Sequence, residues 1–155
     1  SLAFTYMKDK TIDYILRATW QAIARMYNEE AAKYGATMAT GFALISIDPE
    51  KGTPSTALGP KMGIEATSLS RTLKKMEQQG LIDRRPNPED GRGVLIHLTA
   101  FGKEMREFSK GVVLRFDEAV KEQVSEEDIK TFKKVASTIT ELISNKNIYK
   151  KVIHN

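Results

Sequence analysis

Apolar side chains recur at helical spacing over four long stretches of the chain. In residues 9–34, 66–79, 99–124 and 125–145 they return every three or four positions. This spacing places them on one face of a helix, so each stretch predicts an amphipathic helix. The shorter segment 37–47 is apolar on most sides, which indicates a helix buried in the middle of the domain.

Turn-forming residues separate the buried helix from the helix over 66–79. Residues 48–53 are typical of a turn, and Thr53 followed by Pro54 is typical of the cap and first turn of another short helix. The sequence pattern does not define the residue at which this helix ends. The pair Gly59-Pro60 interrupts the pattern, because a proline inside a helix removes one hydrogen bond and clashes with the preceding turn.

The hydrophobic period changes after Gly80, which is placed to terminate the helix over 66–79. Residues 81–85 and 94–98 read as two short strands, and residues 86–93 between them are rich in turn formers. We therefore expect a hairpin with a long, exposed tip. The fold class is mainly α with a small β-hairpin wing, a winged helix-turn-helix flanked by long helices, in which the helix over 66–79 can enter a DNA major groove.

Length and charge agree with a folded nucleic-acid-binding protein. The chain has 155 residues, enough for one domain with dimerisation arms but too few for two full-sized domains. Its net charge of +4 is compatible with a polyanionic partner. The longest stretch without a charged side chain, residues 34–47, has 14 residues, whereas a membrane helix needs about 20. We expect a cytoplasmic protein with no membrane partner.

Several kinds of chemistry are excluded by residues that the sequence lacks. It contains no cysteine, which excludes disulfides, thiolate metal sites and cysteine nucleophiles. Its two histidines, His97 and His154, lie far apart and leave too few imidazoles for a transition-metal site or a catalytic triad. It also has no glycine-rich phosphate loop or nucleophile motif. We predict that the protein is not an enzyme, with no catalytic residue, no metal and no cofactor.

An ordered set of short motifs between residues 58 and 105 resembles the MarR (multiple antibiotic resistance regulator) family of bacterial transcription regulators. The chain departs from the usual family pattern at Gly59-Pro60, where the family generally continues a regular helix. The matching motifs are the recognition helix, its exit, the wing tip and the start of the next helix: Leu69-Ser70-Arg71, Gly80-Leu81-Ile82, Arg84, Asp90, Arg92 and Leu98-Thr99 with Gly102.

This resemblance implies a homodimeric, ligand-responsive repressor of transcription that binds an inverted repeat in double-stranded DNA. Residues 36–99 would form the DNA-binding lobe, and residues 8–35 and 100–155 a helical dimerisation region, together in one intertwined domain. Long helices with wide apolar faces favour a two-fold dimer over a monomer with a large core. The expected interface comprises 9–34, 125–145 and the tail residues Ile148, Tyr149, Val152 and Ile153.

The candidate DNA-binding residues lie on the helix over 66–79 and on the hairpin. Arg71 is suited to reading guanine through two parallel hydrogen bonds, whereas Lys74 and Lys75 are suited to phosphates. The resemblance implies that Arg92 enters the minor groove and that Asp90 orients it. The full set is Thr67, Ser68, Ser70, Arg71, Lys74, Lys75, Arg84, Asn87, Asp90 and Arg92.

The resemblance also implies a small lipophilic or aromatic anionic effector, bound in a cleft between the dimer helices and the DNA-binding lobe. Without cysteine, the peroxide-sensing thiol mechanism found in part of the family is excluded. The cleft would offer an apolar wall with one cationic group. Its predicted lining residues are Tyr14, Arg17, Trp20, Met38, Phe42 and Phe101.

A second interpretation stays open. A basic amphipathic helix is often only a solvated surface, and the hairpin of a winged helix can contact protein instead of DNA. The chain would then be a protein-interaction module without specific DNA binding.

Overall fold

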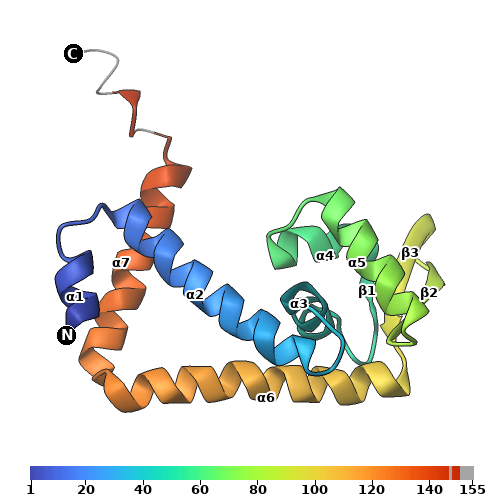
Figure 1. Cartoon of the computed structure of the whole chain (residues 1–155). Coiled ribbons are helices and arrows are strands. Elements are labelled where there is room, and N and C mark those ends of the chain that lie inside the picture. The colour runs from blue at the N-terminus through green and yellow to red at the C-terminus, as the bar shows by residue number, and fades with distance from the viewer. Residues whose placement is uncertain (147, 151–155) are drawn as a thin grey trace. The chain divides into compact units, whose positions relative to one another are not determined.

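The computed structural model describes residues 1–146 and 148–150, and these are mainly helical with one small antiparallel sheet (Figure 1). The chain divides into two compact units, residues 1–112 and 113–155. In chain order the elements are α1 (Leu2–Met7), α2 (Ile12–Ala32), α3 (Met38–Ser46), β1 (Thr53–Pro54), α4 (Ser55–Met62), α5 (Ala66–Gln78), β2 (Ile82–Asn87), β3 (Asp90–Leu98), α6 (Ala100–Gln123) and α7 (Glu126–Ser144).

The predicted long helices and the wing are confirmed, and α1 is an addition to the predicted elements. The turn after α3 contains a correction. Thr53 does not cap a helix: it forms the short strand β1 with Pro54 and pairs with Ile96 of β3. Its hydroxyl accepts a hydrogen bond from the Asp48 amide at 2.8 Å. The helix α4 therefore begins without a side-chain cap, and the wing gains a third strand in the order β1-β3-β2.

The helix α4 continues through Gly59 and Pro60. Gly59 is buried, and a side chain there would approach the carbonyl oxygen of Ile64 to 3.2 Å. The helix ends at Gly63, whose φ of +67° lies in the left-handed region that favours glycine. The Gly59-Pro60 pair therefore lies within the first helix of the motif and lets the chain pack closely as it turns toward α5.

The tip of the wing is shorter than the sequence predicts. Strands β2 and β3 pair regularly from Ile82 opposite Leu98 to Pro86 opposite Val94. The register then shifts, and Asn87 lies opposite Asp90. The expected long tip over 86–93 is thus wrong in its extent, because the strands continue into it and the three residues 91–93 form an irregularity in β3.

A single hydrophobic core joins α3, α4, α5 and the sheet, which lie together beside the start of α6 (Figure 1). The apolar face predicted for α5 is confirmed, since Leu69, Leu73 and Met76 are all buried. From the sheet, Ile82, Ile96 and Leu98 enter the same core. Burial of one face fixes α5 on the lobe and leaves its other face exposed. Among the residues that the structure describes, no helix is long and apolar enough to cross a membrane.

The junction between α5, β2 and α6 is held by backbone contacts. Gly80, after the last turn of α5, has a φ of +76°. The amide of the next residue, Leu81, donates to the Met76 carbonyl at 2.9 Å, and this hydrogen bond caps the end of α5. The Leu81 carbonyl accepts from the Thr99 amide at 3.1 Å. The first turn of α6 then passes so close to Leu81 that a side chain at Gly102 would overlap that carbonyl oxygen.

A pair of glycine substitutions on α6 tests this junction. We expect Gly102→Ala to lower the free energy of unfolding by about 1–3 kcal/mol, because the added methyl overlaps backbone atoms. Gly111→Ala, with no other atom within 4 Å of the added methyl, is the matched control and should raise stability by up to about 1 kcal/mol. Denaturant unfolding of the two variants measures both effects. Equal stability of Gly102→Ala and the parent chain would contradict the close approach.

Candidate nucleic-acid interface

The face of α5 opposite the core is exposed along its length. The helical repeat that buries Leu69, Leu73 and Met76 turns the intervening positions toward solvent. Glu65, which precedes α5, makes no capping hydrogen bond through its side chain, and the amides at the start of a helix favour an anion such as phosphate. The exposed residues are the six that the sequence predicts on this helix: Thr67, Ser68, Ser70, Arg71, Lys74 and Lys75.

The cations near this face differ in how far acidic neighbours neutralise them. Arg84 in β2 pairs with Glu77 of α5, with 3.4 Å between its Nε and the carboxylate. Arg85 pairs with Asp83 of the same strand at 2.8 Å. In the part of the chain that the structure describes, Arg71, Lys74 and Lys75 form no ion pair. Their charges are therefore the ones most available to a phosphate backbone.

The tip of the wing is organised by side chains that bind its backbone. Asp90 accepts a hydrogen bond from the backbone amide of Arg92 at 3.0 Å, and Asn87 accepts one from the amide of Glu89 at 3.1 Å. Within residues 1–146 and 148–150, the Asp90 carboxylate, which the resemblance implies orients Arg92, forms no ion pair with the Arg92 guanidinium. Instead Asp90 shapes the turn, and the exposed Arg92 side chain projects from it without an acidic partner.

The aromatic residues predicted for an effector cleft lie in separate groups. Trp20 of α2 stacks on Phe42 of α3, with ring centroids 6.4 Å apart, and Tyr27 meets the same Phe42 ring edge-on. Met38 begins α3, and its backbone amide donates to the Asn28 side chain at 2.9 Å. These side chains serve the packing of α3 against α2.

Tyr14 and Arg17 belong to a polar group at the start of α2. The Tyr14 hydroxyl is hydrogen-bonded to that of Tyr6 at 2.7 Å, and this bond raises the pKa of Tyr14 above its usual value. Arg17 pairs with Asp13 one turn earlier at 3.3 Å. A hydrogen bond from Thr11 and the neighbouring Arg17 lower the pKa of the Asp13 carboxyl. The cation predicted for the cleft is thus already paired on the helix surface.

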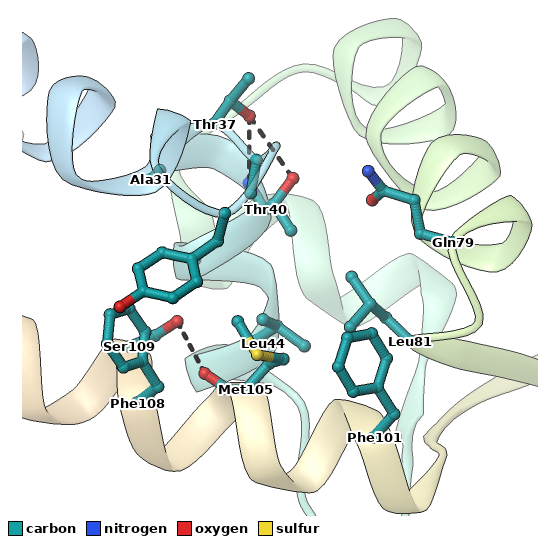
Figure 2. Close-up of a pocket in the computed structure, with 13 residues that line it drawn as sticks. Ala31, Thr37, Thr40, Leu44, Gln79, Leu81, Phe101, Met105, Phe108 and Ser109 are labelled. Carbon is teal, nitrogen blue, oxygen red and sulfur yellow. Dashed lines mark hydrogen bonds between the residues drawn. The ribbon is translucent and has the colours of Figure 1, made fainter.

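A cavity of about 270 Å³ lies within the first unit, between the end of α2, the helix α3, the junction after α5 and the first turns of α6 (Figure 2). Of the six predicted effector residues, Phe101 alone is among its lining residues. Periodicity did not reveal this cavity, although Phe101, Met105 and Phe108 share one face of α6. The lining residues are Ala31, Tyr34, Ala36, Thr37, Thr40, Gly41, Leu44, Gln79, Leu81, Phe101, Met105, Phe108 and Ser109.

The described residues hold no group of three or more histidine, cysteine or acidic side chains that could bind a metal ion. A helix-turn-helix with an exposed hydroxyl-rich and basic second helix, followed by a three-stranded wing, defines the winged helix-turn-helix class of DNA-binding transcription regulators.

Comparison with known proteins agrees with this class. The model of the MarR family matches residues 37–94. The chain is 30% identical to the organic hydroperoxide resistance transcriptional regulator of Bacillus subtilis (strain 168), over 93% of this chain and 97% of that protein. The fold is similar to that of the transcriptional regulator SlyA, with a TM-score of 0.78 and 17% identity over 88% of this chain and 96% of that one.

A further similar structure is that of the S. aureus MepR-DNA complex, with a TM-score of 0.76 and 19% identity over 88% of this chain and 99% of that one. The family model and the relative of nearly full length together show that the chain belongs to the MarR family of transcriptional regulators. This family is non-enzymatic, in agreement with the prediction from the sequence.

Two substitutions should distinguish a residue that binds phosphate from a residue that sets the preference for DNA sequence. We expect Lys74→Ala to weaken binding to every duplex by a similar factor, because one phosphate contact is lost. The slope of log affinity against log salt concentration should fall in magnitude by about one. We expect Arg92→Ala to reduce the preference for a narrow, A·T-rich flank, because such a groove attracts an inserted guanidinium. Fluorescence anisotropy with duplexes of matched length, titrated over salt, measures both. Equal effects of the two variants on sequence preference would contradict this division of roles.

Proposed function

We propose that the protein is a homodimeric repressor that binds an inverted-repeat operator and changes its affinity for DNA when a small effector binds. The observation that carries the DNA-binding part is the exposed face of α5, where Arg71, Lys74 and Lys75 have no acidic partner among the described residues. The opposite, buried face of α5 holds this surface rigidly on the lobe. Rigid presentation lowers the entropy lost when the side chains bind.

In this proposal α5 enters the major groove and the wing contacts the neighbouring minor groove. Arg71 reads a guanine edge, while Lys74, Lys75 and the hydroxyls near the start of α5 bind phosphates. Arg92 inserts into the minor groove, with Asp90 and Asn87 shaping the turn that presents it. Arg84 has the smaller role of holding the wing to α5 through Glu77. The similar fold of MepR, solved as a complex with DNA, supports this use of the lobe.

Self-association is supported by apolar faces on both units. In the first unit Ile12, Leu16 and Trp20 of α2 are each more than two fifths exposed. None of the residues of α7, all of which the structure describes, is buried. Exposed apolar area of this extent favours an interface. The proposed interface comprises 9–34, 125–145 and the tail residues Ile148, Tyr149, Val152 and Ile153, of which Val152 and Ile153 lie outside the described residues.

The cavity beside α6 is the proposed effector site, because it adjoins the segment that fixes α5. Gln79, which lines the cavity, donates a hydrogen bond to the Gly35 carbonyl at 3.3 Å and so links the end of α5 to the loop between α2 and α3. Leu81 lines the same cavity and belongs to the junction with α6. A ligand that binds two positions of this junction with different affinity shifts the population of α5 orientations.

In this proposal the protein does not sense its effector by oxidation of a cysteine thiol. The similarity to an organic hydroperoxide resistance regulator extends over nearly the whole chain. However, these 155 residues contain no cysteine, so a cysteine thiol cannot be the sensing group. A reversible, non-covalent effector is the proposal that fits the cavity.

Selection of bound sequences from a randomised duplex library at near-physiological salt tests the proposal. We expect an inverted repeat with half-sites about one helical turn apart, bound by a species with the mass of two chains in light scattering. Binding that is lost steeply with salt and enriches no sequence would show only the non-specific electrostatic component. That result would overturn the proposal and favour the protein-interaction module.

The dimer interface has its own test. We expect Phe132→Glu, which places a charge on the exposed apolar face of α7, to shift the species in light scattering toward the mass of one chain. Lys130→Glu changes an exposed polar position of the same helix and is the matched control, which should leave the dimer intact. Dissociation by both variants, or by neither, would contradict the proposed interface.

A further inference from the structure

The cavity beside α6 carries no formal charge. Its lining contains four polar side chains besides the Tyr34 hydroxyl, and no lysine, arginine, histidine, aspartate or glutamate. The apolar part includes the rings of Tyr34 and Phe108, whose centroids lie 4.4 Å apart, and the ring of Phe101. The polar side chains are Thr37, Thr40, Gln79 and Ser109.

The charged side chains on the neighbouring turns lie outside the lining of the cavity. Lys33, two residues after Ala31, pairs with Glu30 at 2.8 Å. Arg106, next to Met105 on α6, does not line the cavity, and its guanidinium pairs with Glu107 at 3.3 Å, while its buried Nε has no hydrogen-bond partner among the described residues. Arg17 pairs with Asp13. The described lining itself therefore contains no cationic side chain that could compensate a carboxylate inside the cavity.

From this lining we infer that the effector of this protein is an uncharged aromatic molecule, and not the aromatic anion that the sequence led us to expect. The inference rests on the proposed function, because it assigns the chemistry of the same site. An ion that leaves water for a site without an opposite charge keeps an uncompensated desolvation cost, whereas a neutral ring of the same shape does not. The rings that line the cavity favour a flat aromatic partner.

The polar side chains further favour a ligand that donates a hydrogen bond. The Ser109 hydroxyl already donates its proton to the Met105 carbonyl at 2.9 Å, so its oxygen can only accept from a ligand. Gln79 donates one of its two amide protons to the Gly35 carbonyl, and its side-chain oxygen is available to accept from a ligand. Figure 2 shows Ser109 on α6 and Gln79 on the opposite side of the cavity. A phenol or a primary amide can supply the donor.

A matched pair of probes tests the charge preference directly. 4-Hydroxybenzamide and 4-hydroxybenzoate have nearly the same shape and differ in charge at neutral pH. We expect the amide to bind at least tenfold more tightly to the full chain without DNA, as measured by calorimetry. In methyl-labelled protein its binding should shift the methyl resonance of Met105, which lines the cavity, and leave that of Met62 in α4 unchanged.

Adding a cation to the cavity should reverse the preference. In Gln79→Lys the ammonium group replaces the Gln79 amide in the lining, and we expect the benzoate to bind more tightly than the amide. Gln78→Lys, at the neighbouring exposed glutamine outside the cavity, adds the same charge and should keep the parent preference. Tighter or equal binding of the benzoate by the parent chain, or binding of neither probe, would overturn the inference.

The effect of each probe on affinity for DNA is measured separately from its binding in the cavity. Should the amide bind in the cavity without changing affinity for the selected operator, the chemical assignment would stand and the proposed ligand response would fail. Should benzoate bind the parent chain more tightly and release DNA, the ligand response would stand and the assignment of an uncharged effector would fail.

Discussion

The close packing of Leu81 against the first turn of α6 is the constraint on which the rest of the lobe depends. The amide of Leu81 closes the end of α5, its carbonyl receives the Thr99 amide, and its side chain enters the core. The same carbonyl lies where a side chain at Gly102 would be. One residue therefore joins α5, which presents the proposed DNA-binding face, to strand β2 of the wing and to α6.

The division of charge within the lobe follows from what each face of α5 must contact. The buried face is wholly apolar, so the stability of the helix does not depend on its cations. Those cations can remain unpaired, ready for a polyanion, at little cost because they stay hydrated. Arg84 of β2, by contrast, pairs with Glu77 of α5 across two elements, and this exposed pair contributes about 0–1 kcal/mol to the stability of the lobe. Salt should therefore weaken binding to DNA much more than it weakens the lobe itself.

The sequence predicted the features that depend on local order and missed those that depend on distant neighbours. The apolar face of α5 and the stop at Gly80 are local, and both are confirmed. Thr53 has the local pattern of a helix cap, but pairing with Ile96 makes it a strand residue. The family resemblance implied a cleft with Arg17 as its cationic group, and local spacing did not indicate that Arg17 pairs with Asp13, one turn away. The cavity draws on segments far apart in sequence, so no single period could indicate it.

An uncharged effector limits how the two proposed sites can communicate. A bound anion could oppose DNA by electrostatic repulsion at a distance, but a neutral molecule adds no net charge to the lobe. Its influence must pass through contacts that differ between two arrangements of the protein. The contacts within reach are the Gln79 bond to Gly35 and the packing of Leu81 and Phe101 around the cavity. Since Leu81 also fixes the end of α5, a small displacement there would, under the proposed function, change the angle at which the basic face meets the groove, while the charges on that face stay the same.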